Sequence, residues 1–334
     1  MRTLFIGGTR RGYLALQALI ESGADVVGVL SFTQDDHERE RFEEPIRVLA
    51  QGRGLPVRET KLMRDTGLDG WARELQAETA FAVGVRVLLP GSFYSIFPRG
   101  CWAVHDSLLP EYRGFAPLNW AIINDERETG ATLFKISERM DGGDILLRQP
   151  IPIGANETAP QLYEKICAAT VELVRRGHEL LRRGEGTPQP QNHAAGSFTA
   201  SRTPADGLID WNQSTRRIFN LVRALTFPYP GAFTFYQNRR LFVLSAEEVT
   251  PSPKWVGRIP GRVINLVPNA GVDVLTSDGV LRLCEVSTDG LTRQCAAAVI
   301  KSVRVKLGLD LIELNDRLFQ LEHQMKQTGV PTHE

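Results

Sequence analysis

Short apolar runs alternate with segments of helical periodicity along the first 150 residues. The run RTLFIGG ends in glycines, YLALQALIESG follows with helical apolar spacing, and ADVVGVLSF is a second, valine-rich run. This order of strand, helix and strand predicts a parallel α/β sheet. The alternation continues with a helix in EPIRVLAQGRG, a short strand in LPVRE and a helix in DGWARELQA. The apolar run TAFAVGVRVLLP, residues 79–90, is predicted to be a buried strand. We therefore predict an open, doubly wound N-terminal domain that binds its ligands at the carboxyl ends of the strands.

A long amphipathic helix is predicted over residues 158–184, where apolar residues recur at helical spacing at Leu162, Ile166, Ala169, Leu173 and Leu180. A stretch rich in Pro, Gly, Ser and Thr follows, and its composition is typical of a linker. We expect a catalytic domain over residues 1–190 and the linker over residues 191–206.

The pattern of apolar and polar residues changes after residue 207, from helical spacing to mainly alternating runs. One helix, TRRIFNLVRALT, precedes five alternating runs that Gly, Pro and Asn turns separate, which predicts a small antiparallel β-barrel over residues 207–308. The tail, residues 309–334, is amphipathic, with apolar residues three and four apart from Leu311 to Met325. Two heptads are short for a coiled coil, so packing on its own domain and formation of a homodimer both remain open.

Composition and charge narrow the class of protein. The chain has 334 residues with 39 Lys+Arg and 39 Asp+Glu, so a zero net charge gives no global attraction to nucleic acid or to an anionic membrane. Four scattered cysteines without a C-x-x-C pair argue against zinc and for a reducing compartment. No signal peptide and no membrane-spanning run is found, so we expect a cytoplasmic protein without a metal site.

The glycine-rich start IGGTRRG fits neither G-x-G-x-x-G nor the P-loop pattern, because Tyr13 follows Gly12. A tight strand-to-helix turn is therefore favoured over an NAD site, and a dehydrogenase is the weaker alternative. Arg10 lies where the helix begins and is a candidate contact for an anionic group of a substrate.

Candidate chemistry lies around His105 in WAVHDSLLPEYRG. In a strand, Ala103 and His105 share one face, and a glycine loop with Asp141 follows the next predicted strand. A carboxylate beside a histidine raises the pKa of the imidazole and orients the ring for proton transfer. The hydroxyl of Ser107 is expected to cap the turn, and Arg113 either pairs with a carboxylate or binds substrate.

The long motif HDSLLPEYRGFAPLNWAIINDERETGATLF and the later RMDGGDI resemble the folate-dependent formyltransferases, which include enzymes acting on methionyl-tRNA and on nucleotide-linked amino sugars. The likeness continues through RTPADGLIDW and VRALTFPYPGAF, so it covers nearly the whole chain. It implies a Rossmann-like N-terminal domain and an OB-like C-terminal barrel. It also implies 10-formyltetrahydrofolate as the donor of the formyl group.

The resemblance also implies site residues. It maps the family's histidine and aspartate to His105 and Asp141, which manage proton transfer while an amine attacks the formyl carbon. It implies a folate site around Arg86, Val87 and Leu88 and along the backbone of Met140, Gly142 and Asp144, and it leaves Arg10, Ser107 and Arg113 as candidate substrate contacts.

One position departs from the family pattern, because Ala103 stands where the family has an oxyanion-stabilising asparagine. Loss of one such donor costs about 10²–10³ in rate. Three explanations stay open at this point: one-carbon chemistry from 5,10-methylenetetrahydrofolate, a slow or inactive folate-binding relative, or a site variant from which the asparagine was removed.

The acceptor is expected to be a small-molecule amine, either a nucleotide-linked amino sugar or an amino acid. The tRNA enzymes of the family carry a basic insertion after the second strand, whereas this chain has the acidic run TQDDHERERFEEP over residues 33–45. Clustered carboxylates repel a phosphate backbone, so a tRNA acceptor is not expected.

Overall fold

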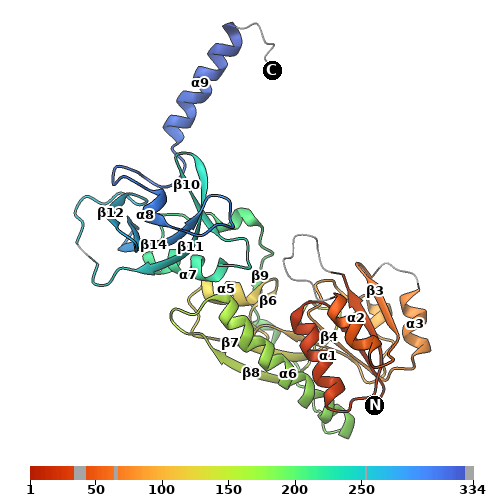
Figure 1. Cartoon of the computed structure of the whole chain (residues 1–334). Helices are drawn as coiled ribbons and strands as arrows, with labels where there is room; N and C mark the ends of the chain where they lie inside the picture. The colour runs from red at the N-terminus through yellow and green to blue at the C-terminus, as the bar shows by residue number, and fades with distance from the viewer. Residues whose placement is uncertain (34–42, 64–66, 253, 328–334) are drawn as a thin grey trace. The chain divides into compact units, whose positions relative to one another are not determined.

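The computed structural model describes residues 1–33, 43–63, 67–252 and 254–327, and the chain divides into two compact units (Figure 1). The first unit comprises Met1–Ala121 and Glu126–Arg202, and the second comprises Ile122–Asp125 and Thr203–Glu334. Most of the acidic run discussed above, residues 34–42, lies outside the described residues.

The first unit is built on a seven-stranded sheet with the order β3-β2-β1-β4-β5-β7-β8. Its strands are β1 (Thr3–Gly7), β2 (Val26–Phe32), β3 (Val57–Thr60), β4 (Thr79–Val83), β5 (Cys101–His105), β7 (Glu128–Lys135) and β8 (Ile145–Pro152). The first five run parallel, as predicted, but β7 is antiparallel to β5, and β8 is antiparallel to β7. The reason for the last pairing is length: only residues 136–144 join β7 to β8, too few for a parallel crossover.

Helices cover this sheet and complete the first unit. They are α1 (Arg10–Glu21), α2 (Glu43–Gln51), α3 (Leu68–Glu74), α4 (Gly91–Tyr94), α5 (Pro117–Ile123), whose last residues fall in the second unit, and α6 (Ala159–Arg183). The long helix predicted over 158–184 is confirmed as α6. A capping box of Thr158 and Gln161 starts it, and Gly184 ends it in the left-handed conformation, as expected for a helix stop.

The strand predicted over residues 79–90 is shorter than expected. Strand β4 ends at Val83, because Gly84 adopts φ +68° and turns the chain out of the sheet. The following residues form a loop at the carboxyl end of β4, where ligands of an open α/β sheet bind. A two-stranded ladder of β6 (Arg113–Gly114) and β9 (Phe198–Thr199) joins the loop after β5 to the segment that follows α6.

The second unit is an antiparallel β-domain, and the five predicted alternating runs are its strands β10 to β14, whereas the short β15 was not predicted. The strands are β10 (Ala232–Tyr236), β11 (Arg239–Glu248), β12 (Val263–Val267), β13 (Gly271–Leu275), β14 (Val280–Ser287) and β15 (Gln294–Cys295). The order is β10-β11-β14-β13-β12, with β15 on β14. The predicted leading helix is α7 (Thr215–Leu225), and α8 (Ala296–Val299) follows β15. The buried faces of β13 and β14 form much of the core of this unit.

The amphipathic tail is helical, as its spacing predicted. Helix α9 (Leu311–Gln327) carries large apolar side chains that are mostly exposed. In the part of the chain that the structure describes, no helix combines the length and apolar character needed to cross a membrane.

Candidate active site

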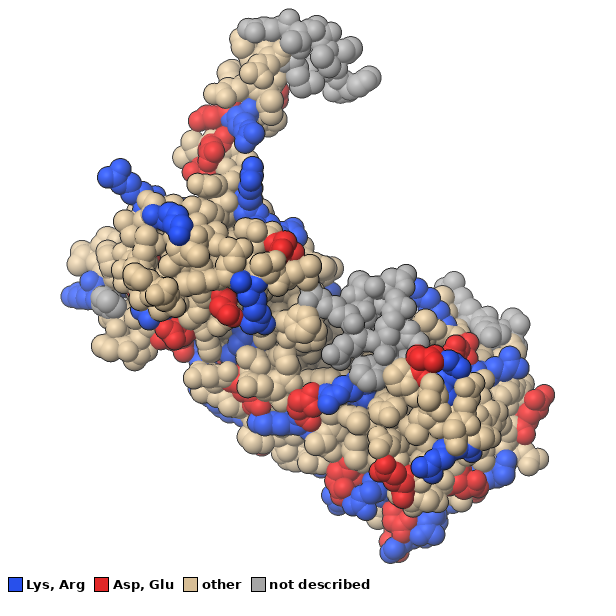
Figure 2. All heavy atoms as spheres, in the orientation of Figure 1, with Lys and Arg blue, Asp and Glu red and all other residues tan. Residues whose placement is uncertain are grey.

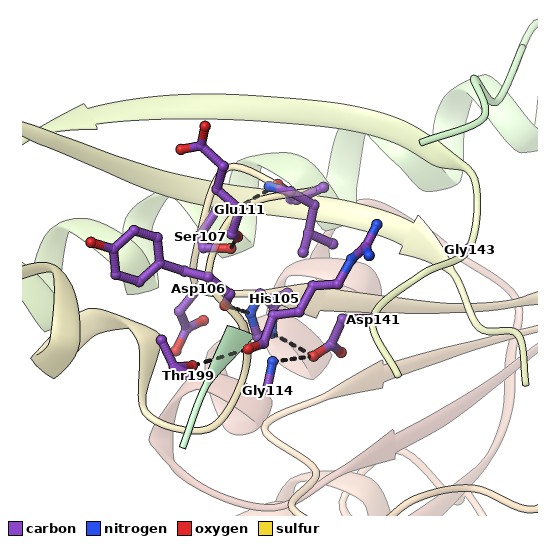
Figure 3. A network of polar contacts seen from close by, with 12 residues as sticks. His105, Asp106, Ser107, Glu111, Gly114, Asp141, Gly143 and Thr199 are labelled. Atoms are coloured by element: carbon purple, nitrogen blue, oxygen red, sulfur yellow. Dashed lines mark hydrogen bonds and ion pairs between the residues drawn. The ribbon is translucent and has the colours of Figure 1, made fainter. Parts of the chain in front are cut away.

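Strand β5 delivers the predicted histidine at its carboxyl end. Ala103 and His105 are two residues apart in the strand, so both side chains project from the same face of the sheet. His105 is 9% exposed. Its Nε2 lies 2.8 Å from the carbonyl oxygen of Tyr112, which only accepts hydrogen bonds, so Nε2 carries the hydrogen. Nδ1 is then the basic nitrogen of the ring, and it faces the carboxylate of Asp141 (Figure 3).

Asp141 is fixed by a backbone donor. The Gly114 N–H donates to Asp141 Oδ2 over 2.8 Å, and the same oxygen lies 3.6 Å from His105 Nδ1. That separation is too long for a hydrogen bond, but the charge of the carboxylate still favours the protonated form of the ring. Burial lowers the pKa of His105, and the opposing effect of Asp141 does not reverse this, so the pKa of His105 lies below its ordinary value. The ring is therefore neutral at pH 7, with a lone pair on Nδ1 beside a carboxylate.

The loop that carries the aspartate permits little side-chain variation. Gly143 leaves no room for a side chain, since a Cβ there would lie 1.7 Å from the carbonyl oxygen of Lys135. Gly142 is buried as well, whereas Met140 is 38% exposed and Asp144 is exposed. Met140 and Asp144, two of the residues predicted to contact the folate, thus face solvent, while Gly142 and Gly143 between them are tightly packed.

The second predicted folate segment lies in the loop after β4. Val87 packs against the same buried cluster as Ala103 and Ile136, which brings this loop and the start of the Asp141 loop to one end of the sheet. Arg86 is exposed, and Leu88 is 75% exposed. An exposed leucine beside two loop backbones provides an apolar surface at the carboxyl ends of β4 and β5.

Ala103 is partly buried and contacts apolar side chains. Its methyl group packs against the buried side chains of Leu109, Phe134 and Ile145. Position 103 therefore contributes no hydrogen-bond donor, and the wall of the site two residues before His105 is apolar.

Two of the predicted substrate contacts, Ser107 and Arg10, bind other groups of the protein. The Ser107 hydroxyl donates to the Glu111 carbonyl over 2.6 Å and is buried, which confirms the turn cap and leaves no hydroxyl hydrogen for a substrate (Figure 3). Arg10 pairs with Glu164 of α6 and so contacts the protein itself. The structure thus brings His105 and Asp141 together but ties Ser107 and Arg10 to other groups.

Arg113 is buried and belongs to a network that the sequence did not indicate. It is 3% exposed, and its Nη2 donates to Gln191 Oε1 over 2.6 Å and lies 3.0 Å from His193 Nδ1. Its guanidinium lies 5.7 Å from the ring centroid of Phe198. Burial lowers the pKa of Arg113, and Asp141 opposes that shift. Gln191 lies in the predicted linker, where a neutral glutamine between Pro190 and Asn192 offers no sequence signal of a role.

An ion pair between Arg11 and Asp106 is a second unpredicted feature. Asp106 follows His105 in sequence, yet its carboxylate pairs with the first turn of α1. Among the described residues, no group of three or more His, Cys, Asp and Glu side chains is arranged to hold a metal ion.

Comparison with known proteins supplies the family. The formyl transferase family matches residues 1–176, and the formyl transferase C-terminal domain matches residues 202–304. A methionyl-tRNA formyltransferase of Alkaliphilus oremlandii is 32% identical over 88% of this chain and 94% of its own length. A methionyl-tRNA formyltransferase of Citrifermentans bemidjiense is 33% identical over 92% of this chain and 95% of its own. These relatives run against the expectation that the acceptor is not a tRNA.

Solved structures share the fold. HypX from Aquifex aeolicus, in complex with tetrahydrofolic acid, aligns with a TM-score of 0.60 and 21% identity over 91% of this chain; the chain spans about half, 47%, of HypX. WlaRD, a sugar 3N-formyl transferase, aligns with a TM-score of 0.64 and 17% identity over 84% of this chain and 96% of its own. With both domains matched along most of its length, the chain belongs to the formyl transferase family.

Proposed function

We propose that the protein transfers a formyl group from 10-formyltetrahydrofolate to an amine, with His105 and Asp141 managing the proton. The observation that carries the proposal is the geometry of this pair: Nε2 of His105 is tied to a carbonyl, and Nδ1 is left as a base beside a fixed carboxylate. A neutral, desolvated imidazole with a carboxylate partner is suited to accept a proton at pH 7.

The residues at this end of the sheet fit a folate. The exposed side chains of Leu88 and Met140 offer apolar surface to an aromatic pteridine, and the backbones of the two loops offer hydrogen-bonding groups. When bound, the folate supplies an activated formyl carbon on its N10 atom. Sugar N-formyltransferases that align with this chain were solved with folate analogues, which supports the same donor here.

The chain's own groups then divide the work as follows. The amine nitrogen forms a bond to the formyl carbon, and the bond between that carbon and N10 breaks. His105 Nδ1 accepts the proton that the amine loses, and the same proton ends on N10 of the departing folate. Asp141 stabilises the imidazolium through its charge 3.6 Å away, and the Tyr112 carbonyl keeps the ring in one orientation.

For the acceptor, we propose a small-molecule amine. Affinity for tRNA needs basic side chains that are available to neutralise phosphates. In the second unit several arginines are instead engaged by carboxylates: Arg216 by Glu248, Arg282 by Asp273 and Arg293 by Glu285. On the face drawn in Figure 2, blue and red side chains are interspersed.

A second acceptor, methionyl-tRNA, is favoured by a different observation. The curated relatives that match over about nine-tenths of this chain at 32–33% identity are methionyl-tRNA formyltransferases. The two acceptors separate in one experiment, because a phosphate-dependent acceptor loses affinity steeply with salt and a small amine does not.

The test supplies purified protein with 10-formyltetrahydrofolate and, in parallel, a dTDP-linked 3-amino sugar, a UDP-linked 4-amino sugar, free methionine and methionyl initiator tRNA, with formylated product read by mass spectrometry. Product from a small amine, absent in His105→Ala, supports the proposal. Product from methionyl-tRNA alone, lost between 50 and 200 mM salt, overturns the small acceptor and supports the second. Product from none of the acceptors, with no loss of formyl donor, contradicts formyl transfer itself.

A further inference from the structure

Gln191 joins the loop that carries Asp141 to the rest of the first unit, and we propose that it is a positioning residue for the reaction. The inference rests on the proposed function of Asp141. Gln191 Nε2 lies 2.8 Å from the carbonyl oxygen of Asp141 and 2.7 Å from that of Gly143. An amide nitrogen has two hydrogens, so this one group holds the backbone on both sides of Gly142. We call these two hydrogen bonds from Gln191 the clamp.

The loop needs such a support because its backbone is strained. Asp141 adopts φ +48°, a left-handed conformation that costs a non-glycine residue on the order of 1–2 kcal/mol. Such residues persist where the surroundings over-determine them. The loop's own backbone bonds, from Gly142 N to the Arg139 carbonyl and from Lys135 N to the Asp144 carbonyl, leave the carbonyls of Asp141 and Gly143 to the glutamine.

The other end of the glutamine is anchored on the strand that holds the carboxylate. Gln191 Oε1 accepts from Arg113 Nη2 over 2.6 Å, and the next residue, Gly114, donates its N–H to Asp141 Oδ2. Gln191 is 7% exposed and Arg113 is 3% exposed, so water does not compete readily for these bonds. The backbone and the carboxylate of Asp141 are therefore fixed to the same two-residue strand, β6, by two routes.

The test compares Gln191→Met, which keeps the length of the side chain and removes its hydrogen bonds, with Gln189→Met, the same change at an exposed position in the same segment. Since a misplacement of about 1 Å costs roughly 10²-fold in rate, we expect kcat to fall by about that factor in Gln191→Met. Gln189→Met should behave as wild type.

A readout independent of turnover follows the pKa of His105 by NMR. Asp141, Arg11 and Arg113 are the described charged groups that act on this ring, and only Asp141 raises its pKa. If the clamp is real, Gln191→Met lets the carboxylate move away, and the pKa of His105 falls in the same direction as in Asp141→Asn. An unchanged pKa together with unchanged kcat overturns the role of Gln191, whatever the acceptor.

Two further results separate this inference from the proposed function. Formyl transfer that survives Asp141→Asn would overturn the role of Asp141, while a fall in the pKa of His105 in Gln191→Met would still support the clamp. Should Gln191→Met fail to fold, Gln191→Glu keeps an acceptor for Arg113 and loses both donors. We expect it to lower kcat as well, and wild-type kcat in that variant overturns the clamp.

A second, independent observation concerns helix α9. Its apolar side chains at a and d spacing are exposed: Leu311 is 71%, Leu318 is 56% and Leu321 is 49% exposed. Ile312 and Phe319 follow the two a residues, lie outside the stripe of a and d positions, and are 77% and 71% exposed. Apolar stripes of this kind mark interaction sites. We propose that α9 pairs in parallel with α9 of a second copy of this chain.

Charge complementarity selects this partner and its direction. With Leu311, Leu318 and Leu321 at positions a, a and d, Arg317 takes position g and Glu322 takes position e. In a parallel pair, g of one helix meets e of the next heptad of its partner, which gives two symmetric Arg317–Glu322 ion pairs. In an antiparallel pair g faces g and e faces e, so Arg317 and Glu322 would not meet.

Sedimentation equilibrium of the full chain over a concentration series tests this proposal. We expect a concentration-dependent dimer that Leu318→Glu abolishes, while Val256→Glu, at another highly exposed apolar position, leaves it intact. Arg317→Glu and Glu322→Arg should each weaken the dimer, and the double change should restore it. A monomer at every concentration, or a double variant no stronger than the singles, overturns parallel self-association.

Discussion

The two segments that bring His105 and Asp141 together are held in different ways. The turn after β5 is held by neighbours: Ser107 binds the Glu111 carbonyl, and the Thr132 hydroxyl of the adjacent strand donates to the Ser107 carbonyl. The Asp141 loop has few bonds of its own and is held by Gln191, fifty residues further along the chain. A compact sequence motif therefore builds one half of the site, and a distant segment positions the other half.

The largest expected effect comes from removing either member of the pair. His105→Ala and Asp141→Asn should each lower kcat by about 10²–10⁴, the range of general acid–base catalysis, with folding preserved in thermal denaturation. Because the two groups act as one unit, the double variant should be little slower than the worse single variant. Losses that multiply would show that the two segments contribute independently.

The next largest effect is expected from a substitution at position 103, two residues before His105 on β5. Ala103→Asn restores an amide donor on the face that carries His105 and should raise formyl transfer by about 10²–10³, measured as kcat with saturating amine. Ala103→Asp, equal in size but without a donor, is the matched control and should give no gain. A lack of gain in both variants would favour one-carbon chemistry that builds no oxyanion, and 5,10-methylenetetrahydrofolate should then be tested as the donor.

The pH dependence tests how the two segments act on one ring. The pKa of His105 lies below its ordinary value of about 6.5, since burial outweighs Asp141. The acid limb of kcat/KM should therefore have its midpoint below that value, and Asp141→Asn should move the midpoint lower still. A midpoint that rises in Asp141→Asn would contradict the placement of the carboxylate.

The same depressed pKa predicts a stability effect. As the pH falls below about 6.5, the unfolded chain binds a proton at this position before the folded chain does, so the free energy of unfolding falls. His178, which burial also shifts down, acts in the same direction. Urea denaturation at pH 7.5 and pH 5.5 should show the loss, and it should shrink in His105→Ala.

The smallest effect concerns the locally held turn. Ser107→Ala removes the hydrogen bond to the Glu111 carbonyl and should lower the free energy of unfolding by about 1 kcal/mol. Its kcat should change less than that of Gln191→Met, because the turn keeps the bond from Thr132 to the Ser107 carbonyl. A larger loss of kcat than in Gln191→Met would reverse the contrast between the two segments.

The sequence predicts the elements that local residues hold in place, and it misses those that depend on distant parts of the chain. Periodicity and caps were enough for α6, whose capping box and terminal glycine are local, and for strands β10 to β14 of the second unit. The antiparallel addition of β7 and β8 was missed, because both strands carry apolar runs and their direction depends on the short connection between them. Gln191 was missed since its role depends on two backbone carbonyls that only the folded chain brings within reach.

The pair of Arg11 and Asp106 has a consequence for the selectivity of the imidazole. Asp106 is the immediate neighbour of His105 in sequence, and a free carboxylate there would compete with Asp141 for influence over the ring. Arg11 pairs with it from the first turn of α1, the place where a dinucleotide-binding chain would hold a phosphate. Asp141 is therefore the carboxylate that raises the proton affinity of His105, while Arg11 pairs with the neighbouring one and itself opposes protonation of the ring.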